Sequence, residues 1–149
     1  MAIQRTFAML KPGVLQRRIV GDVLSRFERK GLNIVALKVM VIPPLLAATH
    51  YAEHKGKSFY TELIEYITSG PVVAMAIEGD EAIQLVRRLC GPTAVCESAP
   101  GTIRGDYCLH TNHNIIHSSD SPDSADRELK LFFQPNELIA WEDGNSHWF

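Results

Sequence analysis

Short apolar runs alternate along this chain with stretches of helical periodicity, and this alternation constrains the fold more than any other feature. Three runs rich in Val, Ile, Leu and Ala end at Gly, Pro or charged residues, as buried strands do: residues 6–10, 33–41 and 72–77. Apolar residues recur every three or four positions elsewhere, which predicts amphipathic helices over residues 21–30, 45–54, 59–69, 80–90 and 125–133. The order fits a parallel α/β sheet and a split β-α-β arrangement equally well.

The remaining segments are less regular. Residues 91–105 contain three Gly and two Pro and predict a long loop, residues 107–117 have partial strand character, and the tail from Gln134 is expected to be irregular. Neither an internal repeat nor a linker interrupts the pattern. The 149 residues are therefore expected to form a single domain, residues 1–149, large enough for one core.

Composition excludes several classes of protein and ligand. A formal charge of −2 provides no general field for gripping a polyanion such as duplex DNA, so any phosphate binding must be local. The three cysteines lack CxxC spacing, and neither an apolar leader nor a run long enough to span a bilayer is present. These features favour a protein of a reducing compartment, the cytoplasm, without membrane attachment.

The densest group of potential metal ligands consists of Cys108, His110, His113 and His117. If this stretch is extended, His113 and His117 share one face while His110 points to the other, so the ligands do not converge. The preferred interpretation is that the protein has no metal site of its own. A metal site here remains the alternative.

His117 follows the β-branched pair Ile115-Ile116 and precedes four small polar residues, so it is expected at the end of a strand. A neutral imidazole there is a competent nucleophile when an acceptor orients its second ring nitrogen, and Glu128 on the next helix could be that acceptor. The simpler alternative is a surface histidine beside a helix N-cap formed by Ser119, Asp120 or Ser121.

Three scattered cations could bind phosphate: Lys11 after the first strand, Arg87 on a helix and Arg104 in the long loop. Each alone is more typical of a solvated surface charge. The chain has neither G-x-x-x-x-G-K-[ST] nor G-x-G-x-x-G. A phosphate site would therefore depend on side-chain cations rather than on a glycine-rich loop.

Several motifs in order and at matching spacing make this chain resemble the nucleoside diphosphate kinase family. They are residues 5–12 (RTFAMLKP), 69–75 (SGPVVAM), 100–106 (PGTIRGD) and 114–121 (NIIHSSDS), followed by Glu128. The resemblance implies an enzyme that transfers the γ-phosphoryl group of a nucleoside triphosphate, mainly ATP, to a nucleoside diphosphate. It also implies a ping-pong mechanism through a phosphohistidine at His117.

The resemblance implies roles for further residues. Lys11, Arg87, Thr93 and Arg104 would hold the phosphates, Phe59 would stack on the base, and Lys11 and Asn114 would bind the sugar hydroxyls. Tyr51 and Glu128 would support the histidine. Mg²⁺ would bridge the nucleotide phosphates without a dedicated protein site.

The implied fold is a ferredoxin-like α/β (α+β) sandwich, a four-stranded antiparallel sheet with helices packed on it, which assembles into homo-oligomers, usually hexamers and sometimes tetramers. One rival function is a catalytically silent nucleotide-binding scaffold of the same fold, against which the full set of motif residues argues. Another is an RNA-binding domain, but the aromatic RNP1 pattern is missing and no specific nucleic acid is expected.

The chain departs from the family pattern at three places. Residues 11–15 read Lys-Pro-Gly-Val-Leu where the family usually has Lys-Pro-Asp-Gly-Val, which leaves the lysine in place. Ala94-Val95 replace a usual Asn-Pro after Thr93, removing a proline that would stiffen the loop. The ending, residues 145–149, also differs, which affects expectations about subunit contacts.

Overall fold

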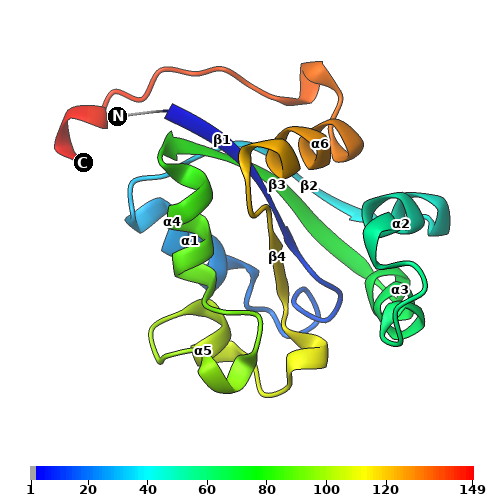
Figure 1. The fold of residues 1–149 in the computed structure, drawn as a ribbon. Coiled ribbons are helices and arrows are strands. Elements are labelled where there is room, and N and C mark those ends of the chain that lie inside the picture. The colour runs from blue at the N-terminus through cyan, green and yellow to red at the C-terminus, as the bar shows by residue number, and fades with distance from the viewer. Residues whose placement is uncertain (1–2) are drawn as a thin grey trace.

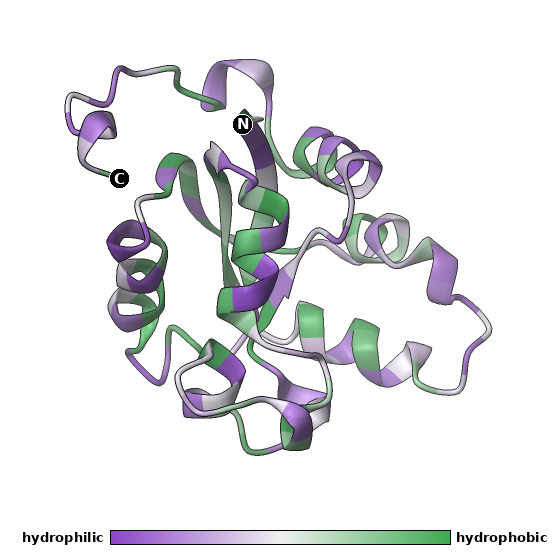
Figure 2. Ribbon diagram, turned by 60° about the vertical axis from the view of Figure 1, so that its left-hand side comes forward, coloured by the Kyte–Doolittle hydropathy of each residue, from purple (hydrophilic) through white to green (hydrophobic). Residues whose placement is uncertain are grey.

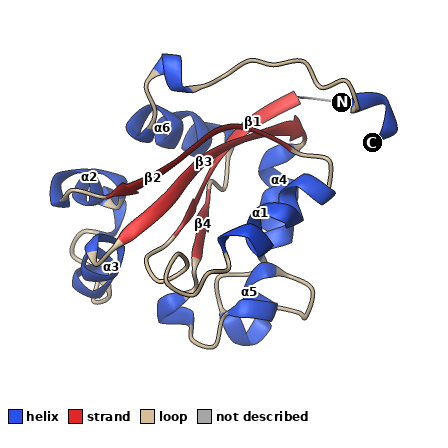
Figure 3. Ribbon diagram, turned by 180° about the vertical axis from the view of Figure 1, so that it is seen from behind, coloured by secondary structure: helices blue, strands red, loops and turns tan. Residues whose placement is uncertain are grey.

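One four-stranded sheet forms the centre of the molecule. The computed structural model describes residues 3–149. Its strands are β1 (Ile3–Leu10), β2 (Asn33–Val41), β3 (Pro71–Asp80) and β4 (Ile116–Ser118), in the order β2-β3-β1-β4 (Figure 3). Every neighbouring pair is antiparallel. The antiparallel sheet confirms the ferredoxin-like sandwich and excludes the parallel alternative.

Helices cover both faces of this sheet (Figure 1). Strand β1 shows why: Ala8 and Leu10 join the core under one helix layer, whereas Phe7 and Met9 join the core under the other. The first layer contains α1 (Val20–Arg29), α4 (Ala82–Cys90) and α5 (Ile103–Tyr107), and the second contains α2 (Pro44–His50), α3 (Tyr60–Thr68) and α6 (Pro122–Phe132). The helices carry hydrophobic and hydrophilic residues on different sides (Figure 2), as the sequence periodicity predicts.

Most predicted elements are confirmed, with shifted ends. Strand β2 covers the predicted residues, but the predicted helix 45–54 is α2 followed by a separate 3₁₀ turn, Ala52–His54. Helix α4 begins later than predicted because Asp80 still pairs with Ile3 in the sheet. Helix α6 begins earlier, at Pro122, because the Ser121 hydroxyl caps it by accepting a hydrogen bond from the Ser124 N–H at 3.1 Å.

Two predictions for residues 91–117 are wrong. The predicted loop contains a 3₁₀ turn, Val95–Glu97, and the start of α5, which Thr102 caps. The predicted strand over 107–117 is almost entirely unpaired: Thr111–His113 is a 3₁₀ turn, and only Ile116–Ser118 pairs with β1. The positive φ of Ile115, +58°, breaks the extended conformation just before β4.

The tail is irregular, as expected, apart from 3₁₀ turns at Pro135–Glu137 and Ser146–Trp148. None of the helices within residues 3–149 combines the length and the apolar content needed to cross a bilayer.

Candidate active site

The sheet register determines which way His117 points. His117 pairs with Met9 of β1, and directly paired residues of antiparallel strands lie on the same face. Met9 belongs to the core under the α6 layer, so the imidazole also faces that layer. The His117 side chain is 22% exposed, which leaves one side of the ring open to a ligand.

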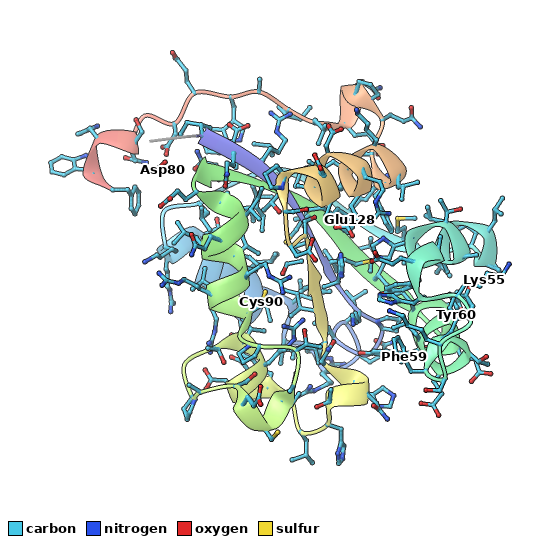
Figure 4. The ribbon with its side chains drawn as sticks, viewed as in Figure 1. Lys55, Phe59, Tyr60, Asp80, Cys90 and Glu128 are labelled. Carbon is cyan, nitrogen blue, oxygen red and sulfur yellow. The ribbon has the colours of Figure 1, made fainter. Side chains whose placement is uncertain are left out.

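Glu128 meets His117 from helix α6. It lies on the buried stripe of that helix with Ala125, Leu129 and Phe132, so its carboxylate points toward the sheet (Figure 4). Its Oε2 lies 2.8 Å from His117 Nε2, and its Oε1 accepts a 2.5 Å hydrogen bond from the Ser119 hydroxyl. Ser119, which the sequence did not single out as a site residue, thus helps to hold the Glu128 carboxylate in place.

The protonation of this pair follows from its geometry. Burial by itself raises the pKa of Glu128, but the hydrogen bonds from His117 and Ser119 and the nearby histidines outweigh it, so that the pKa is lowered. An ionised carboxylate only accepts hydrogen bonds, so the hydrogen of a neutral His117 ring is on Nε2. The lone pair is then on Nδ1, the nitrogen that Glu128 does not hold.

Two consecutive residues at the end of α2, His50 and its C-cap Tyr51, lie beside this pair. The rings of His50 and His117 are 4.7 Å apart, and the rings of His50 and Tyr51 are 4.4 Å apart. Burial, and to a smaller extent the charge of a protonated His117, lowers the pKa of His50 to about 3. Burial, and to a smaller extent the negative charge of Glu128, raises the pKa of Tyr51. Both side chains are therefore neutral near pH 7. His50 was not among the predicted site residues, because its only signal in the sequence is its place in a predicted amphipathic helix.

Lys11, Asn114 and Arg104 are brought together at the ends of β1 and β4. Lys11 Nζ donates a 2.7 Å hydrogen bond to Asn114 Oδ1. The Arg104 guanidinium donates to three backbone carbonyls, those of Gly91, Asn114 and Ile116, at 2.6, 3.2 and 2.5 Å. These bonds tie the end of α4 to the segment that leads into β4.

These cations share a poorly solvated environment. Lys11 is 7% exposed and Arg104 is 5% exposed. Burial, and to a smaller extent repulsion by the positive charge of Arg104, lowers the pKa of Lys11 to about 8. Burial also lowers the pKa of Arg104. Two positive charges held this close, with little water, favour the approach of an anion.

Arg87 and Thr93 are exposed. Arg87, on α4, donates a 3.1 Å hydrogen bond to the carbonyl oxygen of Ser118, the residue after His117. Thr93 is exposed just beyond α4. Within residues 3–149 its side chain makes no hydrogen bond to the other candidate residues.

Phe59 lies at the start of α3 and is 46% exposed (Figure 4). A series of aromatic rings leads from Phe59 toward His117. The Phe59 ring centroid is 5.4 Å from that of His54, which is 6.1 Å from Tyr51. The exposed face of Phe59 is therefore available to a planar ligand.

The four potential metal ligands between residues 108 and 117 do not converge, because His110 and His113 are exposed around a 3₁₀ turn. Across residues 3–149, the cluster with metal-ligand spacing is instead His50, His117 and Glu128.

The arrangement as a whole combines a nucleophilic nitrogen, a carboxylate that orients it, and cations in the adjacent region. Such a set suits phosphoryl transfer, which depends on charge neutralisation and positioning more than on further covalent chemistry.

Comparisons with known proteins agree with this chemistry. The family profile described as "Nucleoside diphosphate kinase" matches residues 4–138. The chain is 58% identical to a nucleoside diphosphate kinase of Treponema pallidum, over the full length of both, and 53% identical to one of Archaeoglobus fulgidus, over 98% and 97% of the two chains.

A solved structure extends the likeness to the backbone. The halophilic nucleoside diphosphate kinase of Halobacterium salinarum, solved in complex with CDP, superposes with a TM-score of 0.96 at 48% identity and covers 99% of this chain and 98% of its own. Because the sequence similarity extends over the full length and the fold is the same, this chain belongs to the nucleoside diphosphate kinase family. These phosphotransferases pass the γ-phosphoryl group of a nucleoside triphosphate to a nucleoside diphosphate.

Proposed function

We propose that His117 carries the phosphoryl group between the two half-reactions of a ping-pong cycle. The observation that carries this proposal is the 2.8 Å contact between His117 Nε2 and Glu128 Oε2. It leaves Nδ1 with the lone pair, on a ring that is partly open to solvent.

In the first half-reaction the Nδ1 lone pair attacks the γ-phosphorus of the triphosphate. An N–P bond forms, the bond from the γ-phosphorus to the β,γ-bridging oxygen breaks, and the nucleoside diphosphate leaves with that electron pair. The ring gains positive charge, which the Glu128 carboxylate stabilises through the Nε2–H hydrogen bond. In the second half-reaction a terminal oxygen of another diphosphate attacks the phosphohistidine, and the lone pair returns to Nδ1.

The other candidates are assigned by their chemistry. We propose that Lys11, Arg87, Thr93 and Arg104 hold the phosphates, that Lys11 and Asn114 bind the sugar hydroxyls, and that Phe59 stacks on the base. Tyr51 would support the histidine through its place beside His50. An aromatic face tolerates every base, because each base has a π-surface.

We also propose that Mg²⁺ binds through the nucleotide phosphates. Mg²⁺ prefers oxygen ligands and is commonly held by phosphates with one or two carboxylates. When bound, Mg²⁺ neutralises part of the phosphate charge.

A labelling experiment tests the central proposal. Protein mixed with γ-labelled ATP and Mg²⁺ should acquire an acid-labile, base-stable label, which GDP then removes as GTP. His117→Ala should acquire no label, whereas the matched control His113→Ala should be labelled like the parent protein. Labelling of His117→Ala, or exchange between ATP and GDP at the parent rate, would contradict the assignment.

Three broader features are proposals as well. A homo-oligomer, a hexamer or a tetramer, is supported by the exposed apolar residues Leu37, Val39 and Val41 on the edge strand β2. A cytoplasmic location is supported by three cysteines that form no disulfide. A single domain over residues 1–149 is supported by a sheet whose strands come from residues 3–118 and a helix layer that continues to Phe132.

A further inference from the structure

His50 is a buried histidine whose polar atoms have no partner. Its side chain is 1% exposed, and neither Nδ1 nor Nε2 makes a hydrogen bond within the described part of the chain. Buried polar atoms are nearly always paired, so an imidazole with two orphaned nitrogens requires a reason. Phe7 and Phe132 pack against it with ring centroids 6.3 and 5.3 Å away, so an apolar ring would suit the same surroundings.

The orphaned nitrogens lie next to the catalytic pair. His50 Nδ1 is 3.7 Å from Glu128 Oε2, too far for a hydrogen bond. One ligand atom each from His50, His117 and Glu128 lies within 4.8 Å of the other two. Two imidazoles and one carboxylate around a common point form the donor set of many zinc sites.

Two of the three spacings between these ligand atoms are close to what a tetrahedral ion needs, and the third, between His50 and His117, is within 4.8 Å. With metal–ligand distances of about 2.0–2.2 Å, the ligand atoms of a tetrahedral site lie about 3.4 Å apart. The 3.7 Å between His50 and Glu128 is already near this value, and the 2.8 Å between His117 and Glu128 would have to open by roughly half an ångström.

We propose that His50, His117 and Glu128 form a binding site for a divalent transition-metal ion, with Zn²⁺ as its first candidate. A water molecule would take the fourth position. This site differs from that of Mg²⁺, which prefers oxygen ligands in octahedral geometry.

Binding there would inhibit the kinase, a consequence that rests on the function proposed above. The ion would bond to His117 Nε2, which faces Glu128, so the hydrogen of the neutral ring would move to Nδ1. The lone pair that attacks phosphorus would then be absent. The ion would also engage the carboxylate that stabilises the phosphorylated ring.

The binding test needs no nucleotide. Metal-free protein is titrated with Co²⁺, whose tetrahedral complexes absorb visible light strongly, and Zn²⁺ is then added to displace it. We expect one Co²⁺ per chain in the parent protein and in the control His147→Phe, which removes an exposed histidine of the tail. His50→Phe, which keeps a ring in the pocket, should weaken binding by about tenfold or more, because one of three protein ligands is lost.

A second variant and a second readout complete the design. Glu128→Gln replaces a carboxylate ligand by a poor amide donor and should weaken Co²⁺ binding to a similar degree, which tests the site even if His50→Phe fails to fold. In kinase assays with excess Mg²⁺, the Zn²⁺ concentration that halves the activity should be higher for His50→Phe than for the parent protein.

Two outcomes would overturn the proposal. One is a parent protein that binds no tetrahedral Co²⁺, as expected if a buried water occupies the space between His50 and Glu128. The other is binding that His50→Phe and Glu128→Gln leave unchanged. A protein that acquires label on His117 but binds no Co²⁺ contradicts this inference alone, whereas one that binds Co²⁺ but acquires no label contradicts only the proposed function.

Discussion

Lys11 is the residue whose charge depends most on its surroundings. Burial and the neighbouring Arg104 lower its pKa to about 8, so the free protein loses this positive charge as the pH rises through that value. A bound phosphate favours the charged form, so deprotonation opposes nucleotide binding. The KM for nucleotides should therefore rise above about pH 8, while kcat changes less.

Steady-state kinetics between about pH 7 and pH 10 measure this effect. Lys11→Arg supplies the control, because a guanidinium keeps its charge throughout this range and should flatten the rise in KM. A parent KM that stays constant across the range would show that Lys11 does not titrate at the site.

We expect Glu128 to affect the reaction through His117 rather than through the substrate. Glu128→Ala removes both the hydrogen bond to Nε2 and the negative charge, and should lower kcat by about 10- to 100-fold with little change in KM. Glu128→Gln keeps an acceptor but loses the charge, so its kcat should lie between those of Glu128→Ala and the parent protein. Equal kcat values for the two variants would show that the hydrogen bond by itself contributes nothing.

At the scale of elements, helix α3 and the 3₁₀ turn before it present Phe59 at the surface. Stacking of a base on one aromatic ring contributes about 1–3 kcal/mol. Phe59→Ala should therefore weaken the binding of purine and pyrimidine diphosphates by a similar factor, about tenfold, as calorimetry would measure. Leu45→Ala, at an exposed apolar residue of α2, is the control. A loss limited to purines would mean that another group recognises the base.

At the scale of the whole molecule, strand β2 forms one edge of the sheet. The tail covers the start of this edge, where the Ile139 N–H donates a 2.9 Å hydrogen bond to the Val35 carbonyl oxygen, but within the described chain no strand pairs with the rest of it. Leu37, Val39 and Val41 are 50%, 62% and 61% exposed there, which is unusual for an edge strand facing water. If β2 is part of a subunit contact, Val39→Lys should reduce the mass seen by light scattering after size exclusion. Leu109→Lys, at an 84% exposed loop residue, should leave it unchanged. A monomeric parent protein would contradict the proposed oligomer.

The fold was largely predictable from the sequence where local periodicity determines structure. The spacing of apolar residues predicts strand β2 and the helices. It does not distinguish a parallel from an antiparallel sheet, and the resemblance to the nucleoside diphosphate kinase family indicated the antiparallel one. Residues 107–117 were mispredicted because non-local hydrogen bonds determine their conformation. Arg104 donates hydrogen bonds to the carbonyl oxygens of Asn114 and Ile116, and Ile115 adopts a positive φ. No local pattern encodes such contacts.

The site was partly predictable for a related reason. Glu128 was a candidate because its helix follows His117 directly, and the structure brings the two into contact. His50 was overlooked because it is 67 positions away from His117 in sequence, and only the packing of α2 against α6 brings it to the pair. Lone histidines on helices carry no signal of such a contact.

None of the ion pairs within residues 3–149 includes Lys11, Arg87 or Arg104. This property affects stability as well as the reaction. The protein without nucleotide therefore keeps mutually repelling charges without carboxylate counter-ions, and in the proposed function a bound polyphosphate would supply the missing negative charge. A ligand at a hundred times its Kd stabilises a fold by about 2.7 kcal/mol. In a nucleotide-rich solution the heat resistance of this chain thus depends on the nucleotide supply, and a weakened variant can be rescued by substrate without a second mutation.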